Sequence, residues 1–175
     1  AVPGMESSIR TTAGAKFFFK RSQKFWVKGA TYGTFEPRDG CDYPEPARVA
    51  QDFALMREAG INTVRIYTVP PSYLLDEALR QGLQVIVGLA WMQHVCFLDD
   101  RQLVSRIREQ LRRDVRACAT HPAVLAFSIG NEIPAPIVRW HGKEKIEAFL
   151  RHLYQDVKRE APNALVTYVN FPPTD

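Results

Sequence analysis

One stretch constrains the fold more than any other: HPAVLAFSIGNEIP, residues 121–134. Its centre, Ala123 to Ile129, is an almost unbroken apolar run flanked by proline and glycine. A run this short, apolar on both faces, is typical of a buried parallel strand. The predicted strand ends in an amide and a carboxylate, Asn131 and Glu132.

Length and composition indicate an ordinary globular domain. The chain has 175 residues, of which 46% are hydrophobic and 24% charged, enough for one domain with a real core. No apolar run approaches the length of a membrane span, and residues 1–12 lack the apolar core of a signal peptide. Residues 1–14 are expected to be a tag remnant and a disordered N-terminus, and residues 15–175 to form the domain. For the cellular location of the protein, the sequence indicates either the cytoplasm or no particular compartment.

Charge and cysteine content point away from several classes. The net charge of +4 lies largely in Arg101 to Arg116, which alternates charged and apolar residues at helical spacing. This favours the solvated face of a helix over a nucleic-acid surface. Cys41, Cys96 and Cys118 are widely spaced and odd in number, so reduced thiols are expected rather than a disulfide framework or a zinc site.

Hydrophobic periodicity predicts a β-hairpin followed by strictly alternating helices and strands. The hairpin turns at residues 21–24, between two apolar runs of which the second is Phe25 to Thr31. Ser72 is expected to cap one helix, and Gly60 and Gly82 to end two helices in left-handed conformation. The other predicted elements are helices over 47–59, 72–81, 99–119 and 143–160, strands over 61–69, 83–90, 123–129 and 165–169, and irregular loops over 34–46, 91–98 and 134–142.

This alternation means parallel strands with right-handed crossovers, either in an open doubly wound sheet or in part of a barrel. A dinucleotide-binding sheet would show GxGxxG after its first strand, but the turn here reads GATYGTFEP. The opening hairpin also suits the floor of a barrel. We therefore predict an α/β fold, a partial (β/α)₈ TIM barrel of about five parallel strands. Barrel enzymes keep their chemistry at the C-terminal strand ends, where Asn131 and Glu132 would lie.

Two charged residues stand out at buried positions. Glu132 sits between Ile129 and Ile133, so partial desolvation would raise its carboxyl pKa as a general acid requires; the alternative is a helix-capping or surface carboxylate. Arg65 lies inside the apolar strand VRIYT and needs a carboxylate or similar partner if buried. It could orient a catalytic carboxylate or form a purely structural pair.

Several further side chains fall at or near predicted C-terminal strand ends. Their aromatic faces could stack on sugar rings or bases, with ordinary loop packing as the alternative. An amide after the last strand could bind a ligand hydroxyl. These residues are Tyr32, Tyr67, Trp91, Trp140 and Asn170. His94 and His141 are isolated and there is no HExxH or GxSxG, so neither a metal site nor a serine nucleophile is expected.

Together, FFFKRSQKFWVKGATYG, INTVRIYT and FSIGNE resemble the retaining glycoside hydrolases of the large (β/α)₈-barrel clan, which includes β-galactosidases, β-glucuronidases, cellulases and β-mannanases. The resemblance covers about residues 17–172. It implies that Glu132 is the acid/base, that Asn131 bonds the sugar 2-hydroxyl and that Arg65 contacts the nucleophile. It also implies that no metal or organic cofactor is needed.

The sequence departs from that clan in one respect. Clan enzymes carry the nucleophile, a second Glu, after the seventh strand, whereas five strands are predicted here. Retaining hydrolysis requires two carboxyl groups about 5 Å apart. Glu36, Asp42 and Asp175 lie near predicted strand ends but in no recognisable nucleophile motif. The chain therefore resembles the N-terminal part of a barrel, without its nucleophile.

The expected function is that of a glycoside-hydrolase-like domain for β-linked saccharides, inactive or nearly so by itself. Substrate contacts are expected from Asn131, Arg65, Trp91, Tyr67, Asn170 and Trp140. The alternative is a non-catalytic carbohydrate-binding or assembly module of a larger carbohydrate-processing protein. An oligo- or polysaccharide is the expected partner, without nucleic acid or membrane insertion, and open barrel edges favour self-association.

Overall fold

The computed structural model describes residues 11–37 and 40–170, and its first element is a small antiparallel sheet. The strands are β1 (Thr12–Gly14), β2 (Phe17–Lys20) and β3 (Gln23–Phe25), paired in that order. The turn between β2 and β3 confirms the predicted hairpin, and β1 adds a third strand. The domain boundary expected at residue 15 falls inside this sheet, while residues 1–10 lie outside the described part.

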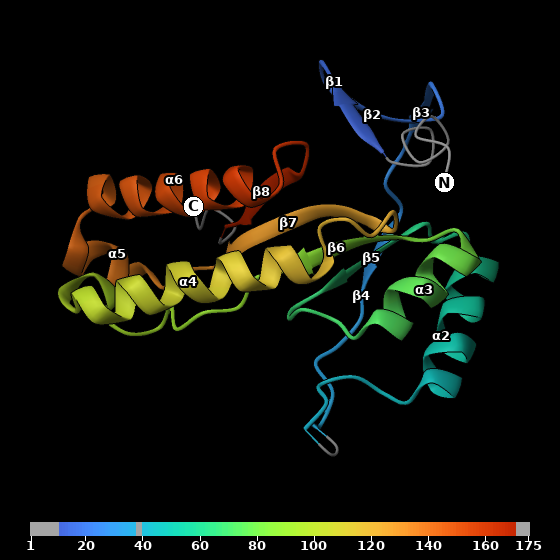
Figure 1. Cartoon of the computed structure of the whole chain (residues 1–175), viewed down its shortest axis with the longest axis horizontal. Coiled ribbons are helices and arrows are strands. Elements are labelled where there is room, and N and C mark those ends of the chain that lie inside the picture. Colours follow the sequence, from blue (N-terminus) through green and yellow to red (C-terminus); the bar gives the residue numbers. More distant parts are fainter. Residues whose placement is uncertain (1–10, 38–39, 171–175) are drawn as a thin grey trace.

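The main body is a parallel five-stranded sheet with strand order β4-β5-β6-β7-β8, as predicted for a partial barrel. Helices follow the strands (Figure 1), with α2 beside α3 and α4 beside α6. The strands are β4 (Gly29–Thr31), β5 (Thr63–Ile66), β6 (Gln84–Gly88), β7 (Val124–Asn131) and β8 (Leu165–Val169). The helices are α2 (Pro46–Glu58), α3 (Ser72–Gln81), α4 (Arg101–Cys118), α5 (Ala135–His141) and α6 (Lys143–Glu160), with a 3₁₀ turn η1 (Phe97–Asp99).

Local signals explain most of these boundaries. Gly60 and Gly82 adopt φ values of 79° and 75°, the left-handed conformation predicted after α2 and α3. Asp100 caps α4: its side chain accepts hydrogen bonds from the backbone N–H groups of Gln102 at 2.8 Å and Leu103 at 3.1 Å. Helices α3 and α6 span 72–81 and 143–160, as the periodicity predicted.

Three local predictions were wrong. The run from Phe25 to Thr31 is not one strand, because it divides between β3 in the small sheet and β4 in the parallel sheet. Ser72 is the first residue of α3 rather than its cap, since Pro71 holds the N-cap position without a side-chain hydrogen bond. Residues 134–142, expected to be irregular, contain α5, which begins just after Pro134, where a fixed proline φ suits a helix start.

Alternation along the strands separates a core face from a site face. Residues such as Val64, Val85 and Phe127 are fully buried in the hydrophobic core with side chains of the helices. Their neighbours on the other face are polar or small, including Arg65, Gly88 and Ser128. The sequence of each strand therefore fixes which side chains can line a site.

The small sheet lies at the N-terminal end of the parallel strands, as expected for the floor of a barrel. Thr11, just before β1, donates a hydrogen bond from Oγ1 to Oε1 of Gln84 at 3.0 Å. Gln84 is the first residue of β6 and is fully buried. Asn62, next to β5, binds the segment between β3 and β4. Its Oδ1 accepts a hydrogen bond from the Lys28 N–H at 2.8 Å, and its Nδ2 donates one to the Trp26 carbonyl at 2.7 Å.

Other predictions meet the structure as follows. Cys41, Cys96 and Cys118 are free thiols. The basic helix α4 is exposed along one side, but Arg108 and Arg112 reach a carboxylate of α6. Within the described residues, no helix combines the length and the apolar character needed to cross a membrane.

That carboxylate, Asp156, joins α4 to α6. It is fully buried and accepts hydrogen bonds from Arg108 at 2.6 and 3.0 Å, from Arg159 at 3.1 Å and from Arg112 at 3.5 Å. Burial by itself raises the pKa of Asp156, but the Arg108 hydrogen bonds and the arginine charges outweigh it, so the pKa lies below its ordinary value. The ionised carboxylate therefore stabilises the fold.

We expect Asp156→Asn to lower the free energy of unfolding by about 2 kcal/mol at pH 7, because three partly exposed guanidinium groups lose their anion. The folded-state pKa is depressed, so this stabilisation is complete above the unfolded pKa of about 3.9 and is lost as pH falls through the folded value. Urea unfolding at pH 7 and below pH 4 measures both effects. Glu109→Gln, which removes an exposed pair with Arg113, serves as control and should cost less than about 0.5 kcal/mol. Equal losses in the two variants would contradict this account.

Candidate active site

A cavity of about 190 Å³ lies at the C-terminal ends of β5, β6 and β7. It occupies the end of the strands where parallel α/β folds bind ligands. Polar groups and one indole ring converge on it from three strands and from the β6–α4 loop. Its lining residues are Arg65, Tyr67, Gly88, Leu89, Ala90, Trp91, Gln93, His94, Ser128, Gly130 and Asn131.

Arg65 and Asn131 meet directly in this cavity. Arg65 Nη2 donates a short hydrogen bond to Asn131 Oδ1, and the guanidinium carbon lies 4.8 Å from the Tyr67 ring centroid. This arrangement fixes Arg65 by a hydrogen bond on one side and a cation–π contact on the other. Arg65 Nε is buried and has no hydrogen-bond partner among the described residues. An unpaired buried donor costs stability, so Arg65 occupies this position at an energetic cost.

Glu132 occupies a turn that β7 forms after a bulge against β8. Ser128 pairs with Thr167 and Asn131 pairs with Val169, so β7 advances three residues while β8 advances two. The register of the ladder therefore shifts between these pairs. Glu132 then takes a φ of 54°, in the left-handed region that few residues other than glycine adopt. Its own N–H donates to the Val169 carbonyl at 2.8 Å.

Tyr168 of β8 secures the other side of this turn. Its hydroxyl accepts a hydrogen bond from the Ile133 N–H at 2.9 Å. Burial raises the pKa of Tyr168; the Ile133 N–H lowers it and the nearby Glu132 charge raises it, with a net upward shift. The phenol therefore stays protonated near neutral pH and keeps its O–H as a donor beside Glu132.

The β6–α4 loop closes the cavity from the opposite side. Trp91 Nε1 donates to the Ile129 carbonyl at 2.8 Å, and its ring packs edge-on against Phe97 at 4.8 Å and Phe149 at 5.4 Å between centroids. The Gln93 amide contacts both backbone polar groups of Asn131, accepting from its N–H at 3.0 Å and donating to its carbonyl. This loop is therefore fixed to β7 by hydrogen bonds as well as by packing.

The structure thus gathers four of the predicted substrate contacts, namely Arg65, Tyr67, Trp91 and Asn131, around one cavity, with Glu132 next to it. Trp140 and Asn170 are outside its lining. Trp140 lies on α5, 69% exposed, and donates from Nε1 to Asp99 at 2.7 Å, while Asn170 is exposed just after β8.

Tyr32 and the two isolated histidines have different surroundings. Tyr32 is a core residue, packed against Phe35 and Phe53, and its hydroxyl donates to Asp52 at 2.9 Å. His94 is an exposed lining residue, whereas His141 is buried beside Phe97. Across residues 11–37 and 40–170, no group of three or more His, Cys, Asp or Glu side chains is placed to hold a metal ion.

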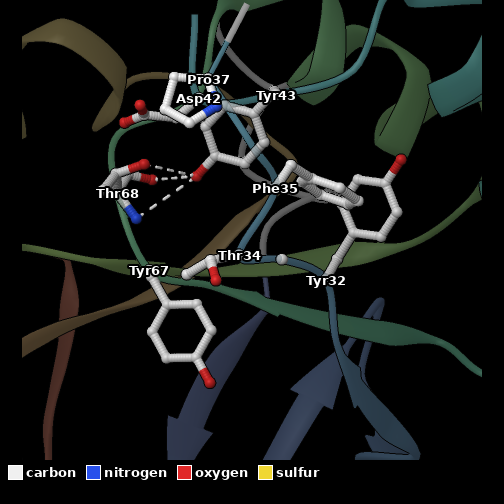
Figure 2. Close-up of a pocket in the computed structure, with 9 residues that line it drawn as sticks. Tyr32, Thr34, Phe35, Pro37, Asp42, Tyr43, Tyr67 and Thr68 are labelled. Atoms are coloured by element: carbon white, nitrogen blue, oxygen red, sulfur yellow. Dashed lines mark hydrogen bonds between the residues drawn. The ribbon is translucent and has the colours of Figure 1, made fainter.

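A second hollow of about 250 Å³ shares Tyr67 with the lining of the first. Figure 2 shows the residues that line this second hollow. It lies where the β4–α2 loop passes the end of β5. Tyr43 closes it from above, its hydroxyl donating to the Thr68 carbonyl at 2.6 Å, and Phe35 forms a wall beside Tyr32. Tyr67 therefore stands between two neighbouring hollows at the same edge of the sheet.

Two residues of this site were not singled out from the sequence. Gln93 is a polar residue inside an aromatic loop that directly follows an apolar strand, which was a usable signal. Tyr168 lies within a correctly predicted strand, but its hydrogen bond to Ile133 depends on the bulge in β7, which no local pattern indicates.

Comparison with known proteins gives a consistent result. The sequence profile of the glucanosyltransferase family, glycoside hydrolase family 72, matches residues 5–164. The 1,3-beta-glucanosyltransferase gel2 of Aspergillus fumigatus is 24% identical over 151 residues, covering 79% of this chain and 31% of gel2. GAS2 of Saccharomyces cerevisiae, also named a 1,3-beta-glucanosyltransferase, is 25% identical over 138 residues, covering 69% of this chain and 25% of GAS2. The chain thus spans about a third or less of these relatives.

Solved structures share the fold. Saccharomyces cerevisiae Gas2p in complex with laminaripentaose superposes with a TM-score of 0.68 at 19% identity, covering 94% of this chain and 41% of Gas2p. The β-glucuronidase of Parabacteroides merdae gives 0.71 at 18% identity, covering 90% of this chain and 20% of that enzyme. The five parallel strands and their helices are therefore part of a TIM barrel of the glycosidase type, as the sequence predicted.

Gly88, at the end of β6, provides a test of how tightly the cavity floor is packed. A Cβ at this position would lie 2.5 Å from the Tyr67 carbonyl oxygen and 2.7 Å from that of Ile66, both backbone atoms. We expect Gly88→Ala to cost about 2 kcal/mol of unfolding free energy, because β5 must move away. Thermal or urea unfolding measures the loss. Gly29→Ala, where the nearest atom would be 3.4 Å away, is the matched control; equal stability of the two variants would rule out this packing constraint.

Proposed function

The chain belongs to the glucanosyltransferase family of glycoside hydrolases, and on that premise we propose that its site binds β-1,3-glucan and supplies the acid/base half of a retaining glycosyl transfer or hydrolysis. The observation that carries the proposal is the cavity in which Arg65 and Asn131 are hydrogen-bonded beside Glu132. The names of gel2 and GAS2 and the laminaripentaose complex of Gas2p support the substrate class.

In this proposal Glu132 is the proton donor and acceptor. In retaining mechanisms one carboxylic acid protonates the glycosidic oxygen while a second carboxylate forms the glycosyl-enzyme intermediate; the first then removes a proton from the acceptor. The acceptor is water in hydrolysis and a sugar hydroxyl in transfer. The tight turn that holds Glu132 next to the cavity suits this role, because the backbone on both sides of it is hydrogen-bonded to β8.

Asn131 and Arg65 bind and orient the sugar at the reacting ring. With Oδ1 taken by Arg65, the Asn131 amide turns its Nδ2 donor away from the guanidinium, where it can bond the sugar 2-hydroxyl. Arg65 lines the cavity, so a guanidinium N–H group that is not bonded to Asn131 can donate to a carboxylate or hydroxyl oxygen. Hydrogen bonds to the 2-hydroxyl strengthen in the oxocarbenium-like transition state.

The aromatic residues provide apolar surfaces for successive sugar rings. Tyr67 separates the two hollows, and Trp91 lines the first, so these two form the inner contacts. Trp140 and Asn170 are more distant and exposed, and we assign them to outer contacts with a longer glucan. No metal or organic cofactor enters this scheme.

A specific observation keeps the binding-module alternative open. Among the described residues no Asp or Glu lines the cavity next to Glu132, and Asp42 lines only the adjoining hollow, so the walls of the cavity itself hold no second carboxylate for a retaining site. By itself this chain would then bind glucan without cleaving it. The same absence is expected if the carboxylate belongs to a part of the protein other than these residues.

The function is tested by calorimetric titration of residues 1–175 with laminaripentaose. We expect binding, retained within about threefold in Glu132→Gln, and weakened about tenfold in Tyr67→Ala because a stacking surface is lost. Trp26→Ala removes an exposed aromatic ring (62% exposed) at the opposite end of the strands and is the control. Absence of binding by the unsubstituted chain, or equal loss in the Tyr67 and Trp26 variants, would count against the site.

Aryl β-glycosides test the catalytic part. We expect no hydrolysis by residues 1–175, since the second carboxylate is absent from the cavity. Robust hydrolysis that disappears in Glu132→Gln would confirm the acid/base and contradict this expectation.

Self-association is a further part of the proposal. Among residues 11–37 and 40–170, β4 pairs only with β5 and β8 only with β7, so each of these two strands has an edge without a neighbouring strand. We expect the chain to form dimers or larger species whose light-scattering mass rises with concentration, and we expect Thr167→Lys, at the exposed position of β8, to reduce that mass. Tyr154→Lys on α6 is the control. A constant monomer mass would exclude association through these edges.

A further inference from the structure

The Gln93 side chain is almost fully buried, with 6% of its surface exposed, although it lies in a loop. Its amide pairs with the backbone of Asn131 on both sides: Oε1 accepts from the N–H at 3.0 Å, and Nε2 donates to the carbonyl. We propose that Gln93 is a positioning residue that sets the backbone of Asn131 and Glu132 for substrate. This inference rests on the function proposed for those two residues.

The chemistry of this contact is selective for a primary amide. A peptide unit presents one donor and one acceptor, and a planar carboxamide offers the complementary acceptor and donor. Ionised glutamate has acceptors only, so one of its oxygens would face the Asn131 carbonyl without a proton between them. Leucine is apolar and one methylene shorter than glutamine, and it would leave the N–H and the carbonyl of Asn131 without their Gln93 partners.

The contact acts at the point where β7 leaves regular geometry. Asn131 is the last residue of β7, and Glu132 follows with a φ of 54°. A left-handed backbone is unfavourable for a non-glycine residue, so the surrounding contacts must impose it. Gln93 holds the residue before Glu132, and the Val169 carbonyl accepts the N–H of Glu132 itself. The turn is thus fixed from β8 on one side and from the β6–α4 loop on the other.

Gln93 can hold this position because its own segment is rigid. Its N–H donates to the Trp91 carbonyl at 2.8 Å, and Trp91 is hydrogen-bonded to Ile129 of β7 and packed against Phe97 and Phe149. The loop is therefore held in place by β7 at Ile129, and through Gln93 it fixes the backbone at the end of the same strand. Gln93 acts through the Asn131 backbone, so its role is positioning rather than catalytic.

The decisive variant is Gln93→Glu, because its contact can be switched by pH. A protonated carboxylic acid donates and accepts as the amide does, whereas the carboxylate cannot donate. Glutamate has an ordinary pKa of about 4.3, and burial raises it, so the contact should be restored near pH 4.5 and lost near pH 8. Arg65, Glu132, Tyr168 and His94 surround the site, so the unsubstituted chain is titrated in parallel to remove their contribution.

The first readout needs no ligand. Amide hydrogen exchange and the backbone amide NMR shifts of Asn131 and Glu132 report the turn directly. We expect Asn131 to exchange at least about tenfold faster in Gln93→Leu at both pH values, and in Gln93→Glu only at pH 8. Met92→Ala, an exposed neighbour in the same loop, should leave both amides unchanged. A Gln93→Glu variant with the same Asn131 protection at pH 4.5 and pH 8 would overturn the proposal.

The second readout is laminaripentaose affinity. We expect Gln93→Leu to bind about tenfold more weakly and Gln93→Glu to lose affinity as pH rises, relative to the unsubstituted chain. If that chain binds and Gln93→Leu binds equally well, Gln93 does not position the site although the proposed function stands. If the unsubstituted chain binds no glucan, the proposed function fails, and with it the role of Gln93 toward substrate. The amide measurements then show only whether Gln93 sets the turn.

Discussion

The pairing of β7 with β6 and β8 is the constraint on which the core and the site both depend. One set of alternate β7 residues, including Phe127 and Ile129, is buried in the hydrophobic core. The other set, including Ser128 and Gly130, lines the cavity. Because side chains alternate strictly, a one-residue slip of β7 would turn Phe127 and Ile129 toward the cavity and Ser128 toward the hydrophobic core. The hydrophobic effect therefore fixes the register, and the register places Asn131 and Glu132 at the open edge.

Departures from regular geometry occur where the site needs them. The bulge between Ser128 and Asn131 and the left-handed Glu132 both lie at the end of β7, and the unpaired Arg65 Nε lies opposite on β5. Strain and unsatisfied donors cost stability, and they persist only where surrounding contacts compensate. Those contacts come from β8 and from the Trp91–Gln93 segment. These segments therefore fix the geometry of the end of β7.

Much of this arrangement could be predicted from the sequence, because its signals are local. The VRIYT and FSIGNE strands predicted that Arg65 and Asn131 share one end of a parallel sheet, and they are in fact hydrogen-bonded. Helix ends at Gly60 and Gly82 followed from backbone conformation. The contacts of Gln93 and Tyr168 could not be predicted, because they depend on how a loop and a bulge meet across strands far apart in the chain. The α5 helix was missed for a related reason: its seven residues are too few for periodicity to be visible.

Contacts between neighbouring strands can form one part of a retaining glycosidase site, but not the part that carries the second carboxylate. In the described part of the chain, the hydrogen bonds that hold Arg65, Asn131 and Glu132 come from β5, β7, β8 and the β6–α4 loop, so neighbouring strands and one loop form this part of the site. A retaining reaction additionally requires a second carboxylate about 5 Å from the acid/base, across the bound sugar rather than beside it. Adjacent strands cannot easily supply that position, because their ends lie side by side along one edge. In the mechanism proposed for Glu132, the partner carboxylate would approach from the opposite side of the ring. The backbone contacts that hold Glu132 do not depend on that second group.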